Sequence, residues 1–107
     1  MKALKIEQSE VLHKAIETFG INEQIEMVIE ECSELIQALQ KLKRAKFSIY
    51  LGEIPKNKTA KQALVYANLC SEIADVKIMI SQCEIMFNKD MIDISVDRKI
   101  ERLKKRL

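Results

Sequence analysis

Two pairs of acidic residues share one spacing along the chain. Glu31 and Glu34 are three residues apart in IEECSELIQAL, and Glu72 and Asp75 are three residues apart in SEIADVKIMI. In an α-helix this spacing puts both side chains of a pair on one face. Each pair also lies one position beside a row of apolar residues. If the two rows face each other, all four carboxylates can converge.

Converging carboxylates predict a metal site. Like charges about 4 Å apart cost several kcal/mol at an intermediate dielectric, and a divalent cation removes that repulsion. Oxygen-only ligands suit Mg²⁺, with Mn²⁺ as a second choice. The competing interpretation is a solvated acidic face, because acids at this spacing are common on exposed helices. A di-iron carboxylate site is excluded, because it requires histidines beside the acids. The only histidine, His13, lies far from both pairs along the chain and is expected at the surface.

Composition indicates which elements position these residues. The chain has 107 residues, 48% of them apolar and 32% charged, with two glycines and one proline. This composition predicts a single all-α domain over residues 1–107. Apolar periodicity predicts an antiparallel bundle of about four helices, at residues 6–19, 23–46, 60–87 and 91–106. A short chain with wide apolar faces is expected to complete its core by oligomerisation.

Local signals set the helix ends. Gly20 is a predicted helix stop and Asn22 a predicted N-cap. Thr59 and Gln62 resemble a capping box at the start of the third helix. Residues 47–58 are interpreted as a loop, with extension of the second helix by FSIYL left open. Five residues of the last helix are expected to face inward: Ile92, Val96, Ile100, Leu103 and Leu107.

Charge and cysteine content bound the partners and the compartment. The formal net charge of +2 is too small to indicate nucleic acid as the main partner. No apolar run reaches transmembrane length, and MKALKIEQSE contains no apolar run of the kind found in signal peptides. Cys32 and Cys83 lie on apolar helical rows and are interpreted as reduced core thiols. Together these features favour a cytoplasmic protein that does not bind membranes.

The acidic motifs resemble those of a known family. EECSELIQAL followed by EIADVKIMI is similar to the MazG-like, all-α nucleoside triphosphate pyrophosphohydrolases, in particular to their small stand-alone members. Glu30, Glu31 and Glu34 match the first acidic motif of that family, and Glu72 and Asp75 match the second. The resemblance covers residue 25 to the C-terminus. The segment between the two motifs is longer than is usual in the family, which puts the substrate contacts in doubt but leaves the acidic residues intact.

The resemblance implies Mg²⁺-dependent cleavage of a nucleoside triphosphate to a monophosphate and pyrophosphate. It implies four metal ligands, Glu31, Glu34, Glu72 and Asp75, with Glu31 or Glu34 also accepting a proton from the attacking water. Glu30 would support the site or pack beside it. The resemblance also implies a homo-oligomer, with a tetramer favoured over a dimer.

Two basic residues complete the match. Lys99 and Arg102 match a basic family motif, which implies that they bind the outer phosphates. Because they are three residues apart, they share one helical face, and the planar guanidinium of Arg102 could bind two phosphate oxygens. The competing interpretation is a solvated basic face that complements the helix dipole.

Two other function classes remain. The first is a non-catalytic helical module for self-association or protein interaction, which would have no reason to cluster four acids. The second is a nucleic-acid binder that uses the basic C-terminal stretch. It is disfavoured by the low net charge and by the lack of stacking aromatic residues.

Overall fold

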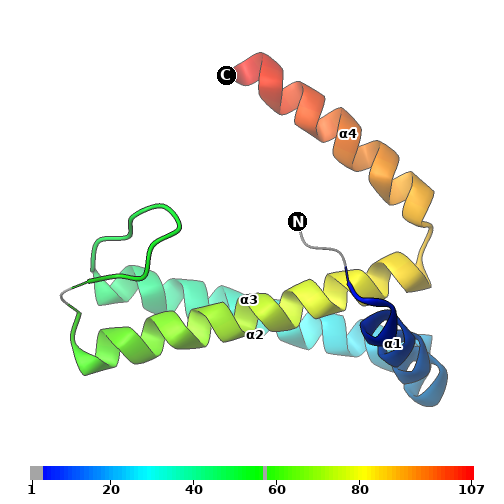
Figure 1. Cartoon of the computed structure of the whole chain (residues 1–107), viewed down its shortest axis with the longest axis horizontal. Helices are drawn as coiled ribbons and strands as arrows, with labels where there is room; N and C mark the ends of the chain where they lie inside the picture. The colour runs from blue at the N-terminus through cyan, green and yellow to red at the C-terminus, as the bar shows by residue number, and fades with distance from the viewer. Residues whose placement is uncertain (1–3, 57) are drawn as a thin grey trace. The chain divides into compact units, whose positions relative to one another are not determined.

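The computed structural model describes residues 4–56 and 58–107. It contains four helices in this part of the chain and no strand: α1 (Ile6–Phe19), α2 (Ile21–Ala45), α3 (Ala60–Met86) and α4 (Lys89–Arg106) (Figure 1). The all-α prediction is therefore confirmed. In the described residues no helix combines the length and the apolarity needed to cross a bilayer.

The chain forms two compact units. One unit consists of Asn22–Met79, and the other combines the chain up to Ile21 with Ile80–Leu107. The first holds nearly all of α2 and most of α3, and we call it the hairpin unit. The second holds α1, the end of α3 and α4, and we call it the terminal unit.

In the hairpin unit, α2 and α3 run antiparallel beside each other (Figure 1). The most buried apolar residues of these two helices are Ala38 at 3% exposure, Leu69 at 5% and Met79 at 9%. On α2 seven of the less exposed positions step by three and four along one face: Gln24, Val28, Glu31, Leu35, Ala38, Leu42 and Ala45. Glu31 therefore lies within the packed face of α2 and not beside it.

The position of the packed faces corrects the sequence-based assignment. Glu72 lies on the α3 side of the interface, in step with Leu69 and Met79. Five residues predicted to lie on the apolar rows or to widen them are exposed instead: Ile29 and Ile36 at 57%, Ile73 at 46%, Ile80 at 44% and Leu39 at 43%. Other predicted row residues are less exposed, among them Val28, Leu35, Leu69 and Val76. Both helices therefore carry apolar side chains on two sides, and the described residues of the hairpin unit cover only one of them. Periodicity alone did not distinguish these two apolar sides of each helix.

The ends of α1 and α2 follow the expected signals in part. Gly20 ends α1 with a φ of +88°, and its N–H donates to the Ile16 carbonyl at 2.8 Å, as expected for a glycine stop. Asn22 is not the N-cap, because α2 begins one residue earlier at Ile21. The break between the two helices is a single residue.

Residues 46–59 form a connecting segment and do not extend α2, apart from residue 57, which lies outside the described residues. Lys46 leaves the helix with a φ of +54°. The Glu53 N–H donates to the Tyr50 carbonyl at 3.0 Å, closing a turn that contains Gly52 at a φ of +76°. Pro55 is fully buried, and the Lys58 ammonium donates to its carbonyl at 2.8 Å.

The predicted capping box at the start of α3 is confirmed. The Thr59 N–H donates to Gln62 Oε1 at 2.9 Å, and the Gln62 N–H donates to Thr59 Oγ1 at 3.1 Å. Gln62 Nε2 also donates to the Ala45 carbonyl at 3.0 Å. One side chain therefore caps the start of α3 and joins it to the end of α2.

In the terminal unit, Leu12 of α1 is buried and Gln82 of α3 is 2% exposed. His13 lies at the surface, as predicted, with Nδ1 2.9 Å from the Ser9 carbonyl oxygen one turn earlier. Asn88 caps α4, because its side-chain oxygen accepts from the Met91 N–H at 3.0 Å.

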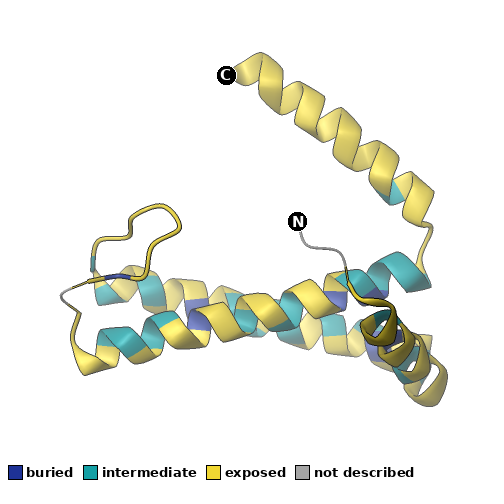
Figure 2. Ribbon diagram, viewed as in Figure 1, coloured by how far each residue is buried: buried dark blue, intermediate teal, exposed yellow. Residues whose placement is uncertain are grey.

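The expectation that α4 faces inward does not hold within the terminal unit. Ile92 is half-buried, and every other residue of α4 is exposed (Figure 2). Val96, Ile100, Leu103 and Leu107 keep 47% or more of their surface exposed. Their spacing does mark an apolar face, but nothing among the described residues of the terminal unit covers it.

The capping box gives a first test of the hairpin unit. We expect Thr59→Ala to lower the free energy of unfolding by about 1 kcal/mol, because it removes the hydroxyl that accepts from the helix N-terminus. Urea unfolding followed by circular dichroism measures this loss. Ser48→Ala, in the same connecting segment, is the matched control. Equal stabilities of the two variants would contradict the role of the cap.

Candidate metal centre

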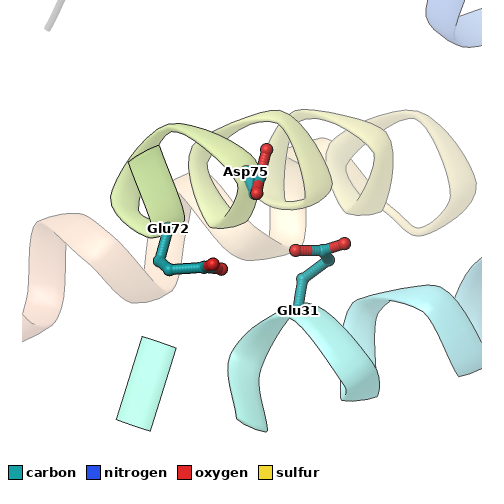
Figure 3. A group of neighbouring side chains, drawn as sticks. All are labelled: Glu31, Glu72 and Asp75. Atoms are coloured by element: carbon teal, nitrogen blue, oxygen red, sulfur yellow. The ribbon is translucent and has the colours of Figure 1, made fainter. Parts of the chain in front are cut away.

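Three carboxylates meet between α2 and α3. Glu31 of α2 and Glu72 and Asp75 of α3 each offer one carboxylate oxygen, and these oxygens lie within 4.8 Å of one another. Figure 3 shows the Glu31 side chain extending from α2 toward the two side chains on α3. All three residues are half-buried and belong to the hairpin unit.

Helix geometry explains the convergence. Glu72 and Asp75 are three residues apart on α3, so both project from the same face. Glu31 belongs to the packed face of α2, which carries the small buried Ala38 two turns later. Small residues let two helices approach closely, so the acids are held together in the interface.

The pKa of two residues of the cluster is raised. Burial raises the pKa of Glu31 above its ordinary value of 4.5, and the charges of the neighbouring acids raise it further. Burial also raises the pKa of Glu72, followed by the charges of Glu34 and Asp75. The ionised forms are disfavoured because several negative charges share a poorly solvated space.

Glu34 is adjacent to this group but is not among the three closest ligands. Among the neighbouring acids, its charge raises the pKa of Glu31 and of Glu72 the most. The predicted four-carboxylate set is therefore three close ligands with Glu34 beside them.

Two oxygens of the cluster have unmet bonding capacity. Glu31 Oε2 and Glu72 Oε2 are buried, and no described residue hydrogen-bonds to either atom. Buried carboxylate oxygens normally accept a hydrogen bond or bind a cation. The donor set contains oxygen only, which fits Mg²⁺ or Mn²⁺ and does not favour the softer metals that prefer sulfur or imidazole.

A basic side chain near the cluster, that of Lys41, was not among the predicted site residues. The positive charge of Lys41 lowers the pKa of Glu72 and so opposes the effect of the acids. Glu31, Glu34, Ala38 and Lys41 step by three, four and three residues along α2 and share one face. This spacing was readable from the sequence and could have identified Lys41.

The remaining predicted residues lie elsewhere. Glu30 is exposed on α2 and is not part of the three-carboxylate group. Lys99 and Arg102 are exposed residues of α4, in the terminal unit. Their contact with phosphate stays a prediction.

No protein-family model, curated protein or solved structure matches this chain.

The raised pKa values predict how stability depends on pH without metal. Because the folded protein holds protons on Glu31 and Glu72 more tightly than the unfolded chain does, stability falls as pH rises above 4.5 through the raised pKa values. In Glu72→Gln the side chain at position 72 is uncharged at every pH. The thermal midpoint of this variant should therefore be higher than that of the wild type at pH 7.5 in chelator. This advantage should shrink as the pH approaches 5.

Thermal melts at each pH measure that difference. Glu26→Gln is the matched control, because Glu26 is an exposed acid of α2 outside the cluster. An equal gain from both variants at pH 7.5 would show that the cluster is not under electrostatic strain.

Proposed function

We propose that this chain is a Mg²⁺-dependent nucleoside triphosphate pyrophosphohydrolase of the MazG-like type. The observation that carries this proposal is the convergence of Glu31, Glu72 and Asp75, with oxygens within 4.8 Å of one another. These are the residues that match the two acidic motifs of the family. The buried, unpartnered oxygens of Glu31 and Glu72 support a cation there over a solvated acidic face.

The acidic residues have two proposed tasks. Glu31, Glu72 and Asp75 hold the cation, with Glu34 completing the set. A bound Mg²⁺ would supply charge that neutralises phosphate oxygens and would favour attack by water. Glu31 or Glu34 accepts the proton from that water as it attacks the α-phosphorus, and pyrophosphate leaves. A carboxylate suits this task where its environment strengthens it as a base.

Basic residues are proposed to bind the negatively charged substrate. Lys41 lies on the same face of α2 as Glu31 and Glu34, and its ammonium group is proposed to attract a phosphate beside the cation. Lys99 and Arg102 are proposed to bind the outer phosphates, as the resemblance implies. The proposed assembly is a homo-oligomer, a tetramer in preference to a dimer.

A second candidate is a non-catalytic helical interaction module. The exposed apolar side chains of α2, α3 and α4 favour it. The carboxylate cluster discriminates between the two, because an interaction module gains nothing from a strained acidic site. Dependence on Mg²⁺ therefore separates the candidates.

The proposal predicts that Mg²⁺ stabilises the fold. A cation that binds only the folded state adds about 2.7 kcal/mol when its concentration is a hundred times the dissociation constant. We expect the thermal midpoint to rise between chelator and millimolar Mg²⁺, and Glu72→Gln to lose most of that rise. An unchanged wild-type midpoint would contradict a metal site.

The proposed chemistry is tested with a panel of nucleoside triphosphates in Mg²⁺, scored for pyrophosphate against orthophosphate. We expect pyrophosphate, and we expect Glu34→Ala and Asp75→Ala to abolish its release while leaving helical content near normal. Glu26→Ala, an exposed acid on α2, should keep the wild-type rate. Full activity of Glu34→Ala on the best substrate would refute the proposed site.

Basic variants separate phosphate binding from metal binding. Lys99→Ala and Arg102→Ala should each lower kcat/KM by about 10²–10³-fold, which corresponds to about 2–4 kcal/mol for a well-placed donor. The Mg²⁺-dependent rise in melting midpoint should survive both changes. If either change removed that rise, its residue would act on the metal site.

A further inference from the structure

One face of α4 is apolar along its whole length. Five residues, which we call the α4 row, step by four, four, three and four: Ile92, Val96, Ile100, Leu103 and Leu107. At 100° per residue they fall within about 80° around the helix. Val96 and Ile100 are each 51% exposed, Leu103 is 47% exposed and Leu107 is 97% exposed.

The row has the geometry of a helix contact. The first three steps cover eleven residues, from Ile92 to Leu103, in three turns. An eleven-residue repeat has about 3.67 residues per turn, close to the 3.6 of a straight helix, so the row runs nearly along the axis. Most helical stability in proteins comes from packing such a face, and the described residues of the terminal unit leave this one uncovered.

Charge on α4 is divided between its two halves. Residues 89–97 carry one basic side chain and three acidic ones, Asp90, Asp93 and Asp97, for a net charge of −2. Residues 98–106 carry six basic side chains and one acid, Glu101, for a net charge of +5. A helix with opposite charges at its two ends complements a second copy that runs the other way.

We propose that α4 pairs in antiparallel orientation with α4 of a second copy of this chain. The antiparallel arrangement sets the acidic end of each helix against the basic end of the other, whereas a parallel arrangement sets the two basic ends against each other. This interface does not depend on the proposed catalytic function, and it would equally serve an interaction module.

The row also specifies the register. With the two-fold axis near Ile100, Ile92 lies opposite the partner's Leu107, and Val96 lies opposite the partner's Leu103. Asp93, Asp97 and Lys104 lie on the same flank of the row. Antiparallel pairing brings matching flanks together, so the partner's Lys104 comes between Asp93 and Asp97.

Two isoleucines of equal exposure provide the first experiment. Ile100 is in the row, whereas Ile94 is also 51% exposed but lies about 160° from the centre of the row. Sedimentation equilibrium should show at least a dimer for the wild type and for Ile94→Lys, and half that mass for Ile100→Lys. Circular dichroism confirms that each variant is folded. A monomeric wild type, or equal masses for the two variants, would overturn the proposal.

Charge reversal tests the orientation. Asp93→Lys combined with Asp97→Lys should weaken association at least tenfold, because it places like charges on one flank. Adding Lys104→Asp to the same chain should restore most of that loss. Failure of the third change to restore association would overturn the antiparallel register.

Cross-linking gives an answer even if a charge variant folds poorly. In a background with Cys32, Cys70 and Cys83 changed to serine, Val96→Cys and Leu103→Cys are placed on separately tagged chains and mixed under oxidation. Antiparallel pairing favours the disulfide between the two different chains, because opposed Cα atoms must approach within about 7 Å. Disulfides that form mainly between identical chains would indicate parallel pairing and overturn the proposal. So would a monomer that binds anionic vesicles through α4.

Discussion

Mutual repulsion among Glu31, Glu72 and Asp75 is the constraint on which the hairpin unit depends. Their oxygens lie within 4.8 Å of one another in the interface between two helices. The same interface supplies the apolar packing that holds α2 and α3 together. Every contact along the hairpin therefore acts against a local force that would separate the helices. Groups of charged residues held together at such a cost are commonly found at functional sites.

Because the core is small, little apolar packing offsets the repulsion among the three carboxylates. The buried apolar residues among those described are Leu12, Ala38, Leu69, Met79 and Pro55. Large apolar side chains such as Ile29, Ile36 and Ile73 lie on outer surfaces of the same helices. Protein cores normally contain side chains of that size and leave alanine to close contacts. Exposed apolar surfaces of this size are typical of chains that bind another protein molecule.

Much of this arrangement was predictable from residue spacing. The four helices, the Gly20 stop, the Thr59 capping box and the convergence of Glu31, Glu72 and Asp75 follow from local rules of three and four residues. The packed face was not predictable in the same way. Because Ile29, Ile36 and Ile73 have the same period as the interface residues, periodicity alone cannot tell which apolar side meets its neighbour in the chain. The same ambiguity applies to α4. Its apolar row has the predicted spacing, but the described residues of the terminal unit do not cover it.

The hydrogen bond from the Gln62 side chain to the Ala45 carbonyl affects how α3 is aligned along α2. It joins the two helices at the closed end of the hairpin, ten residues or about 15 Å along α3 from Glu72. If α3 shifted by one residue against α2, Glu72 would move about 1.5 Å along the axis and turn by about 100°. The carboxylates would then no longer point at one another. The side-chain amide of Gln62 thus helps to fix the register of α3 against α2, and this register decides whether the acids on the two helices meet.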